Sequence, residues 1–273
     1  MAASPARRRT AAALTALLLA ALGAAAVPGY AAFLRPVAAA PADACAEGRP
    51  DGGGPVVVAA GASMTRGTLG HDWVADLRER PGPDGRVIVN AGINGDTSAG
   101  LLGRVDDDVV ACDPDAVVLL IGTNDVRDGV PVEDYRAHLD AITARVTERT
   151  SARVALVSLP PLGEDPGADV NRRLPAYNAA VRAAAEHAGA DYLPVNERFA
   201  ERLAESGAGP AFGFGFGTAY LASAEHYLLG RSWDDVARGN GLGLYVDHIH
   251  LSDEGGAIVT DLVGRWLDAP PDR

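Results

Sequence analysis

Lysine is absent from this chain of 273 residues, so all 24 basic residues are arginines, against 36 aspartates and glutamates. The formal net charge is therefore −12. This balance argues against a nucleic-acid partner, because phosphate binding needs concentrated positive charge. It also disfavours simple adsorption to anionic lipid surfaces.

Cysteine is nearly as scarce, with only Cys45 and Cys112 in the chain. Two widely separated cysteines make a poor metal site, and we predict neither a metal nor a cofactor. The acidic run Asp106–Asp108 lacks the glycines of a calcium loop and is predicted as a solvated helix face. In an exported protein, two cysteines most simply form one disulfide, here between an N-terminal arm and the segment before the third strand. The alternative is two free thiols, one of them buried.

The chain has one long apolar run, Ala11–Val27, which follows the positive cluster Arg7–Arg9. This order is typical of a secretory signal, with Ala24–Ala26 as the small-residue cleavage candidate. Tyr30–Leu34 extend the apolar character, so an uncleaved membrane anchor is the alternative. We predict that residues 1–40 are a signal peptide or an N-terminal membrane anchor outside the folded domain. The protein is then secreted or held in the cell envelope, and it contacts the membrane only through this segment if the segment stays.

The rest of the chain is predicted as a linker, residues 41–54, followed by one domain over residues 55–268. Short apolar runs alternate there with helical patterns, and strands that are apolar throughout are buried on both faces of a parallel sheet. We expect a flavodoxin-like three-layer α/β/α sandwich with a five-stranded parallel sheet. The predicted strands are Pro55–Ala60, Arg86–Asn90, Asp115–Ile121, Arg153–Leu159 and Asp191–Val195, and the predicted helices cover roughly 68–80, 98–111, 131–149, 171–188 and 252–267.

Residues from about 200 to 246 do not fit this alternation. Phenylalanine and glycine alternate in Phe212–Gly217, and an apolar helical pattern follows over Thr218–Leu229. We interpret this region as an insertion over the strand ends, either a mobile lid or acyl-binding wall. The alternative is an extra helix that only covers the core.

Polar residues follow the first three predicted strands, and ligands bind beyond the carboxyl ends of such strands. They occur in Gly61–Met64, Asn90–Thr97 and Gly122–Asp125, and near the end of the chain Asp247 is followed three residues later by His250. In this order, the four blocks resemble the SGNH (GDSL-type) serine hydrolase family of esterases and lipases. The resemblance covers roughly residues 55–267, apart from the insertion, and implies the SGNH hydrolase fold.

The resemblance implies an acyl-enzyme mechanism for carboxylic ester hydrolysis, with Ser63 as nucleophile, His250 as base and Asp247 as the carboxylate that orients the base. The oxyanion hole would consist of the Ser63 and Gly95 backbone N–H groups and the Asn124 side-chain amide. The expected substrates are small-molecule, lipid or acetylated-glycan esters. One difference is that Ala62 stands where the family usually has aspartate, which makes the rigidity of the nucleophile loop uncertain.

The sequence leaves alternatives open for the base and for the function. His248 is a second candidate for the base, although the Asp-x-x-His spacing favours His250. Asp125 is expected only to tie its own loop. At the level of function, the alternatives are an acyltransferase that passes the acyl group to a sugar or alcohol, and a catalytically silent binding module with the same fold.

Overall fold

The computed structural model describes residues 15, 23, 25–80, 82, 85–207 and 209–270 of the chain. Its centre is a five-stranded sheet in the order β2-β1-β3-β4-β5, in which all neighbouring strands are parallel. The predicted three-layer α/β fold with a five-stranded parallel sheet is confirmed. The strands are β1 (Val56–Gly61), β2 (Val87–Gly92), β3 (Ala116–Leu120), β4 (Arg153–Val157) and β5 (Asp191–Leu193).

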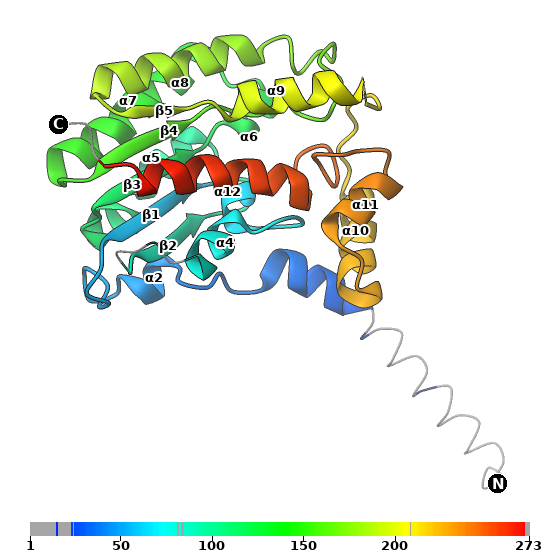
Figure 1. Ribbon diagram of the computed structural model, residues 1–273, viewed down its shortest axis with the longest axis horizontal. Coiled ribbons are helices and arrows are strands. Elements are labelled where there is room, and N and C mark those ends of the chain that lie inside the picture. The colour runs from blue at the N-terminus through cyan, green and yellow to red at the C-terminus, as the bar shows by residue number, and fades with distance from the viewer. Residues whose placement is uncertain are drawn as a thin grey trace, which may run out of the picture.

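Helices cover both faces of the sheet (Figure 1). On one face α5, α7 and α8 pack side by side, and on the other α12 lies between α4 and α9. The helices are η1 (Tyr30–Leu34), α2 (Pro41–Ala44), α3 (Ser63–Arg66), α4 (Trp73–Glu79), α5 (Ser98–Asp108), η2 (Val110–Cys112), α6 (Thr123–Asp128), α7 (Val132–Arg149), α8 (Leu174–Ala188), α9 (Val195–Ser206), α10 (Phe216–Leu229), α11 (Trp233–Gly239) and α12 (Asp253–Asp268).

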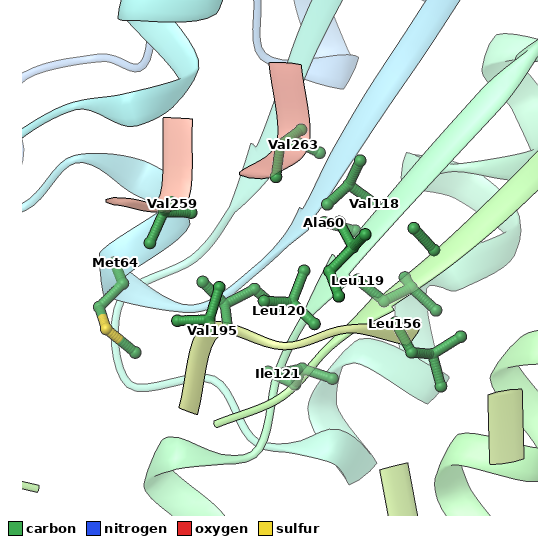
Figure 2. Packing of buried hydrophobic residues seen from close by; sticks show 14 of the residues in the cluster. Ala60, Met64, Val118, Leu119, Leu120, Ile121, Leu156, Val195, Val259 and Val263 are labelled. Carbon is green, nitrogen blue, oxygen red and sulfur yellow. The ribbon is translucent and has the colours of Figure 1, made fainter. Parts of the chain in front are cut away.

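The core explains why the strands carry almost no polar residue. Every residue of β1 and of β3 is buried, because helices pack on both faces of the sheet. Figure 2 shows Val259 and Val263 of α12 next to strand residues such as Ala60 and Leu120. The register places Gly61 opposite both Gly92 and Leu120, so β1, β2 and β3 end at the same level. The loops that follow these three strands therefore start from one edge of the sheet.

Residues 25–44 pack against the domain, although residues 1–40 were predicted to lie outside it and residues 41–54 to be a linker. Ala32 is buried in a small cluster with Leu69 and Ala219. The backbone of Ala39 accepts a hydrogen bond of 2.9 Å from the N–H of Asn90 in β2, which is an edge strand. An edge strand leaves unpaired backbone groups, and covering them is one way to satisfy them. The described part of this segment thus contacts the domain, and the boundary at residue 40 stays a prediction.

The rest of the predicted signal falls mostly on residues that the structure does not describe. Arg7–Arg9 and most of the run Ala11–Val27 lie outside the described residues, and so does Ala24 of the cleavage candidate. Among the described helices, none is both long enough and apolar enough to cross a membrane.

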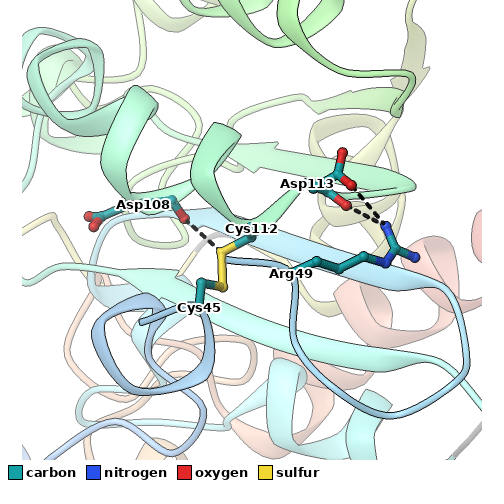
Figure 3. Close-up of a disulfide and its surroundings, with 5 residues drawn as sticks. All are labelled: Cys45, Arg49, Asp108, Cys112 and Asp113. Atoms are coloured by element: carbon teal, nitrogen blue, oxygen red, sulfur yellow. Dashed lines mark hydrogen bonds and ion pairs between the residues drawn. A yellow bond between two sulfur atoms is a disulfide. The ribbon is translucent and has the colours of Figure 1, made fainter. Parts of the chain in front are cut away.

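A disulfide joins Cys45 to Cys112 (Figure 3), as the scarcity of cysteine predicted. Cys45 follows α2 and Cys112 ends η2, just before β3. The bond therefore attaches the N-terminal arm to the sheet next to its central strands. Arg49 reinforces the same junction through contacts with Asp113 and Asp115.

The region expected as an insertion has two parts. The first, α9, belongs to the layer over the sheet, because Phe199 and Leu203 lie in the main core and the helix packs on α12. The second part, α10 and α11, forms its own small cluster around Trp233 and lies beside the N-terminal end of α12 (Figure 1). The predicted helical pattern over Thr218–Leu229 matches α10, whereas α9 and α11 were not predicted.

Candidate active site

Ser63 stands at the start of α3, two residues beyond the end of β1. Its hydroxyl oxygen Oγ lies 3.0 Å from Nε2 of His250, although 187 positions separate the two residues in the chain. The short helix α3 is held from the side by Asn90, whose Nδ2 donates to the carbonyl of Thr65 at 2.9 Å. The side chain of Ser63 is buried against this framework, with only 8% of the residue exposed.

Asp247 and His250 lie in a tight loop that leads into α12. Nδ1 of His250 is 2.7 Å from Oδ2 of Asp247, and the other carboxylate oxygen accepts the backbone N–H groups of Ile249 and His250 at 3.2 and 2.8 Å. A carboxylate only accepts hydrogen bonds, so Nδ1 carries the proton and Nε2 is free to accept one from Ser63. Burial alone raises the pKa of Asp247, but the charge and hydrogen bonds of His250 bring that pKa below its usual value.

The second candidate base, His248, does not form this contact. Its backbone has a positive φ of 73°, which is unusual for a residue other than glycine. Its ring packs edge-on to Phe212 at a centroid distance of 5.8 Å, and burial lowers its pKa. Within the described part of the chain, the buried Nδ1 of His248 has no hydrogen-bond partner. The structure therefore brings His250, and not His248, to Ser63.

The loop after β2 carries Gly95 with a φ of 74°, a backbone conformation that glycine adopts without a steric cost. Among the described residues, and apart from Gly95 and its two chain neighbours, no heavy atom lies within 4 Å of the position that a Cβ of Gly95 would take. The backbone N–H of Ile93, in the same loop, donates to the carbonyl of Gly61 at 3.1 Å. This bond fixes the glycine loop to the end of the strand that leads to Ser63.

Asn124 lies in α6, directly after β3. Gly122 makes the turn between them with a φ of 130°, and the side chain of Tyr135 fills the space where a Cβ would be. The Nδ2 group of Asn124 donates to the carbonyl of Asp96 at 2.7 Å, so one of its two N–H bonds is used. The residue after Gly95 and the side chain of Asn124 are therefore directly joined.

Asp125 is buried and bonds outside its own loop, contrary to the expectation. Its carboxylate accepts the backbone N–H of Ser98 at 3.0 Å and also the Ser98 hydroxyl. The same hydroxyl lies 2.9 Å from Nδ1 of His138 in α7. Asp125 thus fixes the start of α5, the helix that follows the glycine loop.

Glu164 is a supporting residue that the sequence interpretation missed. Its side chain is buried, and one carboxylate oxygen accepts the N–H groups of Gly243, Leu244 and Tyr245 at 2.8, 2.6 and 3.2 Å. These residues lead directly into the loop that carries Asp247. No local motif marks Glu164, because its three donors lie about eighty positions away in the chain.

Aromatic side chains from the glycine-rich segment before α10 lie next to the two histidines. The ring of Phe214 is 6.2 Å from that of His250, and Phe212 contacts His248. Phe214 also packs against Phe216, whose side chain is largely exposed. This segment therefore forms an apolar wall beside the candidate base.

The described residues contain no group of three or more histidine, cysteine, aspartate or glutamate side chains arranged to hold a metal ion. The acidic run in α5 forms ion pairs instead: Asp106 with Arg145 and Arg149, and Asp108 with Arg104. At this edge of the sheet, a hydroxyl, an imidazole and a carboxylate form one hydrogen-bonded line.

A model of the GDSL-like lipase/acylhydrolase family matches residues 52–258 of this chain. No curated protein matches it in sequence.

Solved structures with the same fold include an acetylxylan esterase from Geobacillus stearothermophilus, with a TM-score of 0.58 and 20% identity over 81% of this chain and 98% of that chain. An acetyl xylan esterase named AlAXEase has a TM-score of 0.58 and 22% identity over 78% and 99% of the two chains. An alpha/beta hydrolase enzyme from the metagenome of Lake Arreo, Spain, has a TM-score of 0.58 and 20% identity over 81% and 99%.

Proposed function

The chain belongs to the GDSL-like lipase/acylhydrolase family and is a carboxylic ester hydrolase; from this premise we propose that it is an exported serine esterase acting through Ser63, His250 and Asp247. The proposal rests on one observation, the continuous line of contacts of 3.0 Å from Ser63 to His250 and 2.7 Å from His250 to Asp247. A serine hydroxyl becomes a useful nucleophile when an oriented base accepts its proton.

In the first half of the reaction, Oγ of Ser63 attacks the ester carbonyl carbon while Nε2 of His250 takes the hydroxyl proton. The tetrahedral intermediate collapses when the C–O bond to the alcohol breaks, and His250 gives its proton to the departing alcohol oxygen. In the second half, His250 takes a proton from water while the water oxygen attacks the acyl carbon. The bond from the acyl carbon to Oγ of Ser63 then breaks, His250 returns the proton to Oγ, and the carboxylic acid leaves. Asp247 stabilises the imidazolium in both halves without accepting its proton.

The negative oxygen of each intermediate needs donors at a fixed position. We assign this role to the backbone N–H groups of Ser63 and Gly95 and to the second N–H of the Asn124 amide. The hydrogen bond from Asn124 to the carbonyl of Asp96 supports the assignment, because it orients the amide and leaves its other N–H available. Removing one such donor typically lowers kcat by about 100- to 1,000-fold.

For the substrate, we propose short acyl esters, with acetylated glycans as the first class to test. Two of the similar structures are described as acetylxylan esterases. The ring of Phe214, 6.2 Å from that of His250, restricts the space beside the base and so favours a small acyl group. A lipid ester is the second class, supported by the apolar character of the same phenylalanine-rich segment.

Export is proposed from two features. A disulfide persists in oxidising compartments, and Cys45 and Cys112 form one. The second feature is the N-terminal cleavage candidate Ala24–Ala26. It lies just before Pro28, whose carbonyl accepts a hydrogen bond of 2.8 Å from Ser223 in α10. Cleavage there would keep almost all of the segment that packs on the domain. N-terminal sequencing of the exported protein should find a new terminus at Val27, whereas an intact Met1 in a membrane fraction would support the anchor instead.

The catalytic proposal is tested on the full chain, because residues 33–43 form one wall of a hollow of about 500 Å³ beside the loop after β2. A fluorophosphonate probe should label the wild type and fail to label Ser63→Ala. Ser158→Ala is the matched control, since Ser158 is also a buried serine directly after a strand. Equal labelling of Ser63→Ala and the wild type would refute the assignment of the nucleophile.

Substrate class is tested with a chromogenic ester series from acetate to palmitate, together with acetylated xylo-oligosaccharides. We expect the highest kcat/KM at acetate and release of acetate from the oligosaccharides. An optimum at long acyl chains would favour the lipid ester class instead. Transfer of the acyl group to an added sugar or alcohol in preference to water would identify an acyltransferase.

A further inference from the structure

Arg104 projects from α5 toward the loops of the candidate site and is largely buried, with 15% of its side chain exposed. Its Nε and Nη2 atoms lie 2.8 and 2.7 Å from Oδ2 of Asp96. Nη1 donates to the carbonyl of Ala91 at 3.0 Å, and Nη2 donates to the carbonyl of Gly61 at 3.1 Å. Nη1 also contacts Asp108, one turn further along the helix, at 2.8 Å.

These partners belong to different parts of the candidate site. Gly61 is the last residue of β1, two positions before Ser63, and Ala91 lies near the end of β2. Asp96 directly follows Gly95, and its carbonyl accepts the hydrogen bond from Asn124. The guanidinium group of Arg104 is thus hydrogen-bonded directly to the chain segments that carry the Ser63 and Gly95 backbone N–H groups. It is linked to the third proposed donor, the Asn124 amide, through Asp96.

The arginine fork suits this position better than any other side chain. Arg104 supplies donors, in fixed directions, to two backbone carbonyls at the ends of neighbouring parallel strands, those of Gly61 and Ala91. A planar guanidinium with five N–H groups can serve a carboxylate and two carbonyls at once, whereas a lysine ammonium acts as a compact charge with freely rotating donors. Because Arg104 and Asp96 are mostly shielded from water, the contacts are charge-assisted and screened little by salt.

We propose that Arg104 is a positioning residue for the oxyanion hole, holding the ends of β1 and β2 and the loop of Gly95 in one fixed geometry. The inference rests on the proposed esterase function and adds a residue to it. Arg104 touches no reacting atom; it acts by keeping the donors at the distances that the intermediate requires. Loss of this clamp should lower kcat and leave KM nearly unchanged, since the donors act on charge that develops only after binding.

The test compares Arg104→Gln and Arg104→Lys with the wild type, all as full chains. Arg145→Gln is the matched control, because Arg145 also binds a backbone carbonyl, that of Leu102 within α5 at 3.1 Å, and pairs with Asp106 of the same helix. We expect Arg104→Gln to lower kcat by roughly 10- to 100-fold, in the range that misplacement by about 1 Å produces. Arg104→Lys should recover part of this loss, because it restores the charge opposite Asp96 but not the fork. Arg145→Gln should match the wild type.

Amide hydrogen exchange gives a second readout that needs no turnover. Arg104→Gln should speed exchange in residues 91–97, while the rest of the sheet and the Arg145→Gln variant keep wild-type rates. Wild-type exchange in residues 91–97, or a kcat equal to that of the wild type, would overturn the inference. A uniform rise across the whole sheet would also overturn it, because Arg104 would then stabilise the fold in general. If the wild type hydrolyses no ester, the proposed function fails, and the exchange data alone decide whether Arg104 holds the loop.

Discussion

Replacing Asp247 by asparagine is the sharpest test of the hydrogen-bonded line, because the structure predicts how the new amide will orient. Oδ1 of Asp247 accepts two backbone N–H groups, from Ile249 at 3.2 Å and from His250 at 2.8 Å. In Asp247→Asn this position must hold the amide oxygen, because an NH₂ group there would face two donors. The amide nitrogen is then forced into the place of Oδ2, 2.7 Å from Nδ1 of His250.

An NH₂ group facing Nδ1 donates to it, so Nδ1 becomes the acceptor and the imidazole proton moves to Nε2. Nε2 then points an N–H bond at Ser63 and can no longer take the hydroxyl proton. A change of this kind in a Ser-His-Asp site lowers kcat by about 10,000-fold, equivalent to about 5.4 kcal/mol in the activation free energy. The fold should survive, since asparagine has nearly the same shape and keeps both backbone hydrogen bonds.

The assay is the steady-state hydrolysis of a soluble acetate ester, together with the rate of fluorophosphonate labelling. Asp191→Asn is the control, because Asp191 also accepts side-chain hydrogen bonds, from Arg153 and Trp266, but stands at the start of β5, far along the sheet from the site. A folded Asp247→Asn variant that keeps more than a tenth of wild-type kcat would refute the tautomer argument.

Adding Asp247→Asn to Ser63→Ala should cause almost no further loss of kcat, because the effects of residues that act as a unit are not additive.

Three further results are expected. Replacing both Cys45 and Cys112 by serine should lower the free energy of unfolding by about 4 kcal/mol, because their disulfide closes a loop across 67 positions. Urea unfolding measures this loss, and an unchanged unfolding midpoint would contradict the prediction. Burial alone lowers the pKa of His71, but its contacts with two carboxylates raise it, so its stabilising effect is full below the unfolded pKa of about 6.5 and fades as the pH rises through the folded value. The stability difference between wild type and His71→Asn should therefore shrink from pH 5.5 to 8.5, and a constant or growing difference would exclude this linkage. Phe214→Ala should raise kcat/KM for longer acyl esters relative to acetate, and an unchanged ratio would show that this ring does not limit acyl length.

The sheet and the meeting of its loops were predictable because both follow from short-range patterns. A strand buried on both faces must be apolar throughout, so β1 and β3 stand out in the sequence. Once the strands are known to be parallel, their carboxyl ends share one edge, and this rule alone brings Gly95 and Asn124 close to Ser63. The Asp-x-x-His spacing is also local, because both residues lie in one turn of chain before α12.

Contacts between distant segments were not predictable in the same way. Residues 25–44 read as an exported leader and a linker because they are rich in alanine and proline, yet they cover the edge strand β2 and part of α10. Arg104 reads as a surface residue of an amphipathic helix, and only the register of β1 and β2 shows that two carbonyls lie within its reach. Glu164 is missed for the same reason, since its donors come from a loop near the other end of the chain.

Ala62, the residue before the proposed nucleophile, shows how such contacts change the meaning of a motif. The sequence interpretation left the rigidity of the Ser63 loop uncertain because Ala62 replaces the aspartate usual in the family. The structure buries Ala62 in the main core, where an unpaired carboxylate would cost free energy. The turn is held from outside the motif instead: Asn90 binds the carbonyl of Thr65, and Arg104 binds that of Gly61. Asn90 lies on β2 and Arg104 on α5, so the order of the loop depends on these two neighbouring elements and not on its own residues.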